Sequence, residues 1–130
     1  MAQDTTRRSR AEVMQALAAE LRPVLDGSLQ GMYVYLDDAH KLCNPRFASM
    51  LGYDSPADWD RPASFTEQYV DPGSQHTLVA AYRDAMQHQV AATIDVTWKR
   101  RDGGAVSTSV ILVPIAHSGE LMALHFVTPQ

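Results

Sequence analysis

Lys41-Leu-Cys-Asn-Pro-Arg-Phe-Ala-Ser-Met-Leu-Gly-Tyr53 is the stretch from which the fold of this chain can be read. It opens with extended residues and turns abruptly into a short helix. Asn44 is a good N-cap, because its side-chain oxygen can accept a hydrogen bond from the first helical turn. Pro45 suits the first helical position, where no N–H is needed. Gly52 tolerates a positive φ and ends the helix. The stretch therefore predicts a strand, one or two helical turns and a glycine stop.

Short motifs precede and follow this stretch in a defined order. They are Val34-Tyr35-Leu36-Asp37, Asn44-Pro45-Arg46-Phe47, Gly52-Tyr53, Asp71-Pro72, Arg100-Arg101-Asp102-Gly103 and Pro114-Ile115. The ordered series resembles the PAS sensor family over roughly residues 29–128. It departs from the family after Asp71-Pro72, where the second acidic residue of the family's pattern is missing.

A helix is expected to precede the main domain. Ser9 and Glu12 have the spacing of a capping box. Apolar residues then recur at steps of three and four and form a narrow seam, made of Met14, Leu17, Leu21 and Val24. Pro23 is expected to kink or end this helix. We therefore divide the chain into a leader with a flanking helix, residues 1–28, and a PAS-like sensor domain, residues 29–130.

Five strands are expected in the main domain, at about 31–36, 41–43, 93–99, 106–114 and 121–127. Short helices fit between the second and third strands, followed by a longer helix over about 74–88. Asp102-Gly103 and His117-Ser118-Gly119 supply the last two turns. The resemblance implies an α+β fold, a five-stranded antiparallel sheet in the order 2-1-5-4-3 with the short helices on one face.

Strand parity predicts which side chains face the core and could line a ligand pocket. The predicted pocket residues are Val34, Leu36, Phe47, Leu51, Tyr82, Ile94, Val96, Trp98, Thr108, Val110, Leu112, Leu124 and Phe126, with Met122 also inward. The Thr108 hydroxyl and the Trp98 N–H could anchor a small metabolite. The alternative is a filled core in which both groups are hydrogen-bonded internally.

The opposite face of the sheet would then carry Ile111, Val113, Ala123, His125 and Val127. This face is too apolar to stay in contact with water. The N-terminal helix is its natural cover, supplied by the same chain or by a second copy. The second arrangement predicts a homodimer interface made of Met14, Leu17, Leu21, Val24, Ile111, Val113 and Val127.

Cofactor sites known in the family fit this sequence poorly. Haem-binding members hold iron from a histidine on the long helix, where this chain has His76. The spacing from His76 to Asp102-Gly103 is short, no arginine stands near Ile94, and Trp98 competes for the space. Flavin photosensors need a cysteine in the stretch that corresponds to 59–69, which has none, and Cys43 lies elsewhere. The histidines lack metal-ligand spacing, so no metal is expected.

Composition fits a single domain without nucleic-acid or membrane partners. The chain has 130 residues, 45% of them apolar, and a net charge of −4. The Arg7, Arg8 and Arg10 cluster could contact phosphate or acidic lipid, but a solvated leader is expected. One cysteine excludes an internal disulfide. No apolar segment has the length of a membrane span or the pattern of a signal peptide, so we expect a cytoplasmic location.

No catalytic motif stands out. Neither a G-x-S-x-G turn nor a phosphate-binding loop is present. The pairs Asp37-Asp38 and Asp58 with Asp60 lie in expected turns, where solvated carboxylates are common. We therefore expect no catalysis by this chain.

The resemblance implies a sensory module that responds to a ligand or partner through protein contacts. Such a module is free-standing or is part of a histidine kinase or transcription regulator. A cone-shaped α+β enzyme like ketosteroid isomerase is an alternative, but it needs an inward carboxylate, and Asp95 has the wrong parity. A third hypothesis is an interaction module with a solid core and therefore no ligand pocket.

Overall fold

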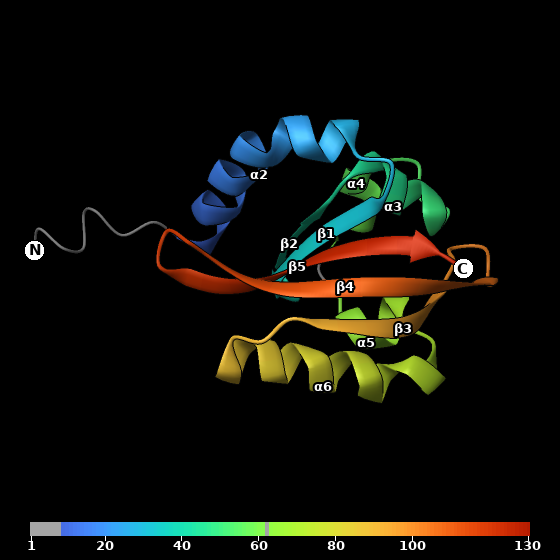
Figure 1. Cartoon of the computed structure of the whole chain (residues 1–130). Helices are drawn as coiled ribbons and strands as arrows, with labels where there is room; N and C mark the ends of the chain where they lie inside the picture. The colour runs from blue at the N-terminus through green and yellow to red at the C-terminus, as the bar shows by residue number, and fades with distance from the viewer. Residues whose placement is uncertain (1–8, 62) are drawn as a thin grey trace, which may run out of the picture.

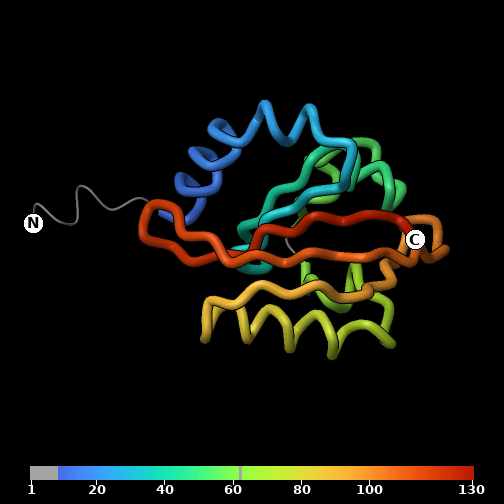
Figure 2. Tube along the Cα trace, viewed as in Figure 1, coloured from blue at the N-terminus to red at the C-terminus, as the bar shows by residue number. Residues whose placement is uncertain are grey.

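The structure is a computed structural model that describes residues 9–61 and 63–130. The leader predicted before Ser9, with Arg7 and Arg8, lies outside the described residues. The elements are α2 (Arg10–Gly27), β1 (Gly31–Asp37), β2 (His40–Cys43), α3 (Pro45–Met50), α4 (Pro56–Trp59), α5 (Phe65–Tyr69), α6 (Pro72–His88), β3 (Ala92–Lys99), β4 (Ala105–His117) and β5 (Glu120–Pro129). Figures 1 and 2 show their arrangement in space.

All five strands form one antiparallel sheet in the order β2-β1-β5-β4-β3 (Figure 1). The predicted PAS-like α+β fold is confirmed. Helices α3 to α6 pack on one face of the sheet, here called the inner face. Helix α2 packs on the other, the outer face. The two strands before α3 belong to the same sheet as the three closing strands, an order that the cone-shaped alternative does not have.

The helix boundaries follow from local chemistry. Ser9 Oγ accepts from the N–H of Glu12 at 3.2 Å, and Glu12 Oε1 accepts from the N–H of Ser9 at 3.0 Å, so the predicted capping box is formed. The helix was predicted to kink or end at Pro23. It does not end there, because α2 continues to Gly27. Because Pro23 has no N–H, the carbonyl of Ala19 one turn earlier has no helical partner. Both residues are exposed, so water can solvate this carbonyl.

The predicted parity holds for β3 and β4 but was wrong for β1 and β5. The turn between β4 and β5 has two residues, so that His117 pairs with Glu120. Opposite partners in an antiparallel pair share a face. Val110 and Leu112, which point inward, therefore stand opposite Val127 and His125. Ala123, His125 and Val127 consequently point inward, against the prediction.

The other set of β5 residues points outward, together with its β1 partners. Met122, Leu124 and Phe126 stand opposite Ile115, Val113 and Ile111. Val34 pairs with Leu124 and belongs with Leu36 to the apolar cluster under α2. The inward placement of Val34, Leu36, Met122, Leu124 and Phe126 was therefore wrong. Tyr33 and Tyr35 occupy the inner face of β1 instead.

Helix α2 covers part of the outer face within the same chain. Val13, Met14 and Leu17 pack with residues of β1 and β5, and Leu21 lies against the same cluster. Arg10 anchors the start of the helix through ion pairs to Asp37 at 2.7 Å and Glu120 at 3.4 Å. Of the predicted interface residues, Val127 lies inside the core, whereas Val24 and Ile111 remain 52% and 42% exposed.

Candidate ligand pocket

Most of the inner face is filled by side chains. Trp98 is fully buried, its Nε1 donates to Thr108 Oγ1 at 2.9 Å, and Thr108 donates to the carbonyl of Val96 at 2.7 Å. The two polar groups expected to anchor a ligand therefore satisfy each other and the backbone. Around them pack other residues predicted for the pocket, namely Phe47, Leu51, Ile94, Val96, Val110 and Leu112. At this end the molecule follows the filled-core alternative.

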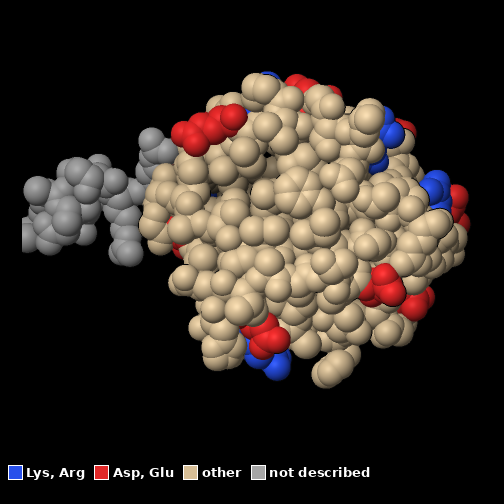
Figure 3. Space-filling model, in the orientation of Figure 1, with Lys and Arg blue, Asp and Glu red and all other residues tan. Residues whose placement is uncertain are grey.

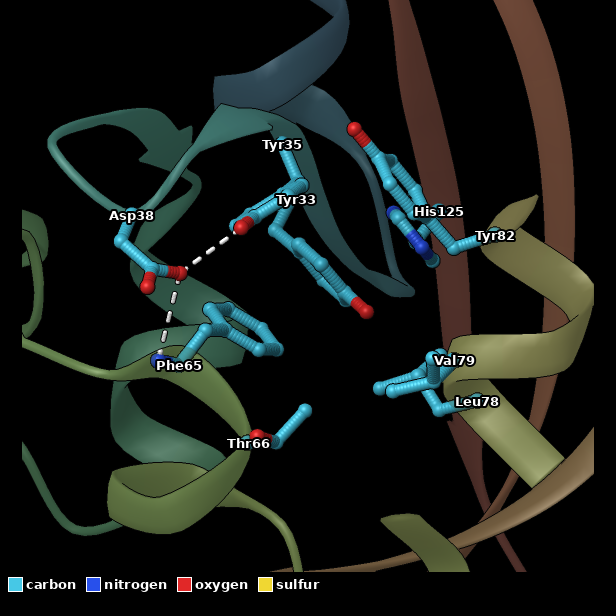
Figure 4. A pocket seen from close by; sticks show the side chains of 9 residues that line it. All are labelled: Tyr33, Tyr35, Asp38, Phe65, Thr66, Leu78, Val79, Tyr82 and His125. Atoms are coloured by element: carbon cyan, nitrogen blue, oxygen red, sulfur yellow. Dashed lines mark hydrogen bonds between the residues drawn. The ribbon is translucent and has the colours of Figure 1, made fainter. Parts of the chain in front are cut away.

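A pocket of about 260 Å³ lies further along the inner face, between β1 and β5 on one side and α5 and α6 on the other. Its lining residues are Tyr33, Tyr35, Asp38, Phe65, Thr66, Leu78, Val79, Tyr82 and His125 (Figure 4). Tyr82 is the one predicted pocket residue among them. The corrected parity explains the rest of the sheet side. His125 was expected on the opposite face, and Tyr33 and Tyr35 alternate along β1 with Val34 and Leu36, which were expected inward.

Tyr33 and His125 form the floor of this pocket. They stand opposite each other in the β1–β5 register, and their rings stack with centroids 3.8 Å apart and planes 7° apart. Phe65 of α5 stacks on Tyr33, with the two ring centroids 5.5 Å apart. Tyr33 is 1% exposed and His125 is 2% exposed, so both polar tips are withdrawn from solvent.

One buried polar atom of each floor residue lacks a hydrogen-bond partner within the described part of the chain. Among the described residues, three buried side-chain atoms have none: Tyr33 Oη, His125 Nδ1 and Trp59 Nε1. The first two belong to residues that line the pocket. An unpaired buried polar group costs about 1–3 kcal/mol, so a molecule that bonds to these atoms recovers free energy on binding.

Burial also decides the charge of the floor. It raises the pKa of Tyr33 well above its usual value. It lowers the pKa of His125 to about 3, and hydrogen bonding of the ring to the backbone of Tyr33 and Ala123 offsets this only in part. At neutral pH the phenol and the imidazole are therefore both uncharged. A neutral imidazole nitrogen either donates or accepts, and a hydroxyl does both, so Tyr33 Oη and His125 Nδ1 together can donate and accept.

The mouth of the pocket is held by Asp38, which follows β1. Its Oδ1 accepts from Tyr35 Oη at 2.7 Å and from the N–H of Phe65 at 3.3 Å, as the dashed lines of Figure 4 show. Tyr82 Oη donates to the carbonyl of Leu36 at 3.4 Å. These bonds join the β1–β2 turn to α5, and β1 to α6. Asp38 is the one charged residue of the lining at neutral pH.

The other residues considered for chemistry lie apart from the pocket. His76 is exposed on α6 and does not line it. Cys43 is buried, and burial raises the pKa of its thiol, which disfavours the reactive thiolate. Asp95 is exposed and accepts from Gln130 Nε2 at 2.8 Å, so it is not the inward carboxylate that a cone-shaped enzyme needs.

Residues 9–61 and 63–130 contain no group of three or more metal-binding side chains. Within the same ranges, no helix combines the length and the apolar character that a bilayer crossing requires.

One sequence pattern predicts that His125 faces the pocket. Ser118-Gly119 is a two-residue hairpin turn, which places His117 opposite Glu120. Counting back from that pair puts His125 on the same face as Leu112. No comparable sequence pattern predicts that Phe65, Thr66 and Asp38 line the pocket, because a short helix and a turn position them.

Comparison with known proteins gives the same fold. No family model and no curated protein matches the sequence. Among solved structures, the PAS domain of an HTR-like protein from Haloarcula marismortui is 22% identical, with a TM-score of 0.64 over 93% of this chain and 98% of that chain. A PAS domain of a protein from Colwellia psychrerythraea is 15% identical, with a TM-score of 0.69 over 88% and 97%.

A third solved structure is a PAS domain from a two-component sensor histidine kinase. It is 9% identical to this chain, with a TM-score of 0.66 over 89% of this chain and 98% of that one. At these identities the likeness concerns the fold. The expected resemblance to PAS domains is confirmed at that level.

Proposed function

We propose that this chain, which has the fold of a PAS domain, is a sensory module without catalysis of its own. It binds a small ligand in the pocket over Tyr33 and His125 and signals through protein contacts. The observation that carries the proposal is the pocket itself, which lies between the sheet and two helices and is floored by two residues that each have a buried polar atom without a partner among the described residues.

The path from ligand to signal runs through two strands. On β1, Tyr33 and Tyr35 face the pocket while Val34 and Leu36 face α2. On β5, His125 faces the pocket and its neighbour Leu124 lies against the cluster under α2. A shift of either strand is therefore transmitted to the helix on the other face. The ligand biases this equilibrium only by the difference in its affinity for the two arrangements.

The partners in this proposal are a second copy of the chain and an output protein in the cytoplasm. The likeness to a PAS domain of a sensor histidine kinase supports a kinase as the output, and a transcription regulator is the other candidate. A homodimer would use the part of the outer face that α2 leaves uncovered. Ile111 and Val113 lie there, and Val24 is exposed on α2 itself.

Native mass spectrometry of freshly purified full chain, with an absorbance scan, tests the proposal. We expect a bound small mass that partial denaturation releases. Hydrogen exchange should then be faster in Arg10–Gly27 after ligand removal than before it, because α2 loses a preferred packing. Absence of any bound mass would instead support an interaction module with a solid core, and a bound mass whose removal leaves exchange in α2 unchanged would contradict the signal path to that helix. A Soret band would identify haem as the ligand.

A further inference from the structure

We propose that the pocket selects a small, uncharged, planar aromatic molecule that carries a hydrogen-bond donor beside an acceptor. This inference rests on the proposed function and names the chemical class of the ligand. It follows from the size, the walls, the floor and the charge of the pocket.

The size limits the ligand to one ring with a substituent or to two fused rings. The pocket measures about 260 Å³. A cavity of about 150 Å³ holds a benzene molecule, so this pocket accepts on the order of ten non-hydrogen atoms. A larger metabolite such as a nucleotide would fill the pocket with only part of its structure.

The walls favour a flat aromatic shape. Tyr33 and Phe65 lie 5.5 Å apart with planes 27° from parallel. Tyr35 meets Phe65 and Tyr82 edge to face, at 65° and 85°. Aromatic rings bind one another in offset-stacked and edge-to-face geometries. These walls therefore offer both geometries to a planar guest, whereas Leu78 and Val79 close the remaining side.

The floor requires hydrogen-bonding groups on the guest. Figure 4 shows the Tyr33 hydroxyl pointing into the space between Phe65 and Val79. Neither this oxygen nor His125 Nδ1 has a partner among the described residues. A hydroxyl both donates and accepts, and a neutral imidazole nitrogen does one or the other. A guest with an adjacent donor and acceptor can pair with both atoms, whereas a hydrocarbon leaves them unpaired.

The charges of the lining disfavour ions. No lysine or arginine lines the pocket, so an anion would be buried without a counter-charge and near the Asp38 carboxylate. A cation could approach Asp38, but that side chain is exposed at the mouth and already accepts from Tyr35 and Phe65. At the floor, where the unpaired atoms lie, a cation would lose its hydration without a partner charge. An uncharged guest avoids both penalties.

Three probes of nearly equal shape test this class: benzamide, benzoate and benzamidine. They are uncharged, negative and positive at neutral pH, and each is a benzene ring with a planar substituent. The affinity of the ligand-free full chain for each is measured by isothermal titration or ligand-observed NMR. We expect benzamide to bind at least tenfold more tightly than either ion.

Tyr33→Phe tests the floor directly. It removes one hydroxyl and keeps the ring, so we expect about tenfold weaker benzamide binding. The melting temperature of the ligand-free protein should not fall, because that hydroxyl has no partner to lose. Tyr53→Phe is the matched control, since Tyr53 lies outside the pocket lining. Unchanged benzamide affinity in Tyr33→Phe would overturn the assigned role of the hydroxyl.

The outcomes separate this inference from the proposed function. Tighter binding of benzoate or benzamidine refutes the uncharged class and leaves ligand sensing standing. Failure of all three probes, in a protein that carries a natural small mass after purification, has the same meaning. Failure of all three in a protein that carries none refutes both the class and the sensing function.

Discussion

Asn44 uses every hydrogen-bonding position of its side chain. Its Oδ1 accepts from the N–H groups of Phe47 and Met32, and its Nδ2 donates to the carbonyls of Gln30 and Leu25. One buried residue therefore joins the end of α2, the start of β1 and the first turn of α3. The N-cap that the sequence predicts is only part of what this side chain does.

Substitution of Asn44 should consequently cost more than loss of a cap. We expect Asn44→Ala to lower the free energy of unfolding by about 2–4 kcal/mol, because the cap is lost and buried backbone groups are left unpaired. Ser55→Ala is the control. Ser55 caps α4 through Asp58 alone, so about 1 kcal/mol is expected. Denaturant unfolding measures both, and equal losses would show that the bonds of Asn44 to α2 and β1 contribute little.

His125 makes stability depend on pH. The pKa of this ring is lowered to about 3 by burial, whereas an unfolded histidine titrates near about 6.5. Between these values the unfolded chain binds a proton that the folded chain does not, so stability falls as the pH falls through this window. The slope approaches about 1.4 kcal/mol per pH unit.

His125→Phe should remove this dependence and keep a ring stacked on Tyr33. Denaturant unfolding at pH 7 and pH 5 should show that the wild type loses about 2 kcal/mol more than the variant. His76→Gln, which changes an exposed histidine on α6, should behave as the wild type does. If His125→Phe and the wild type had parallel pH profiles, His125 would not be buried in the neutral form.

At the scale of elements, α2 is too small to cover the whole outer face of the sheet. Helix α2 covers the part of the face formed by Val34, Leu36 and Met122. Ile111 stays 42% exposed, and its β5 partner Phe126 is half-buried. With α5 behind the strands, as in Figure 1, the surface over β4 and β5 carries few charged side chains (Figure 3). A surface with few charged side chains and an exposed isoleucine suits a second copy of the chain.

Ile111→Asp should separate such a dimer into monomers. The substitution places a charge on an exposed position, so it should leave the fold intact. Leu17 is a poorer site for the test, because its side chain on the sheet-facing side of α2 is 4% exposed and a charge there would disrupt the monomer. Val90→Asp, at another exposed apolar position away from the sheet face, is the control. Light scattering measures the mass, and a wild-type monomer of unchanged size in both variants would contradict the dimer.

At the scale of the whole molecule, one sheet separates two apolar layers. The inner layer contains the aromatic pocket, and the outer layer contains α2. Neighbouring residues of β1 and β5 belong to different layers, so neither strand can move without disturbing both. This shared use of two strands is the physical basis of the signal path that we propose across the sheet.

Accuracy of the sequence-based parity differed between strands for a physical reason. In β3, apolar Ile94, Val96 and Trp98 alternate with polar residues, so one face is marked as buried. In β1 and β5 both faces are apolar, because one lies against α3 to α6 and the other against α2 or its surroundings. The alternation of apolar and polar residues then does not show which side chains of the strand point inward. The pairing with β4 decides it, and that pairing starts at the Ser118-Gly119 turn.

The amino-acid sequence alone determined where the helices begin, where the chain turns and which segments are strands. Caps, prolines and turn glycines act on backbone groups within a few residues, so their effect can be read locally, as at Asn44 and Gly52. Only the tertiary structure decided that Tyr33 and His125 stack on the floor of a pocket while Trp98 and Thr108 satisfy each other. The orientation of a strand buried on both faces depends on its pairing with strands distant in the chain, and the space left for a ligand depends on how all the layers pack together.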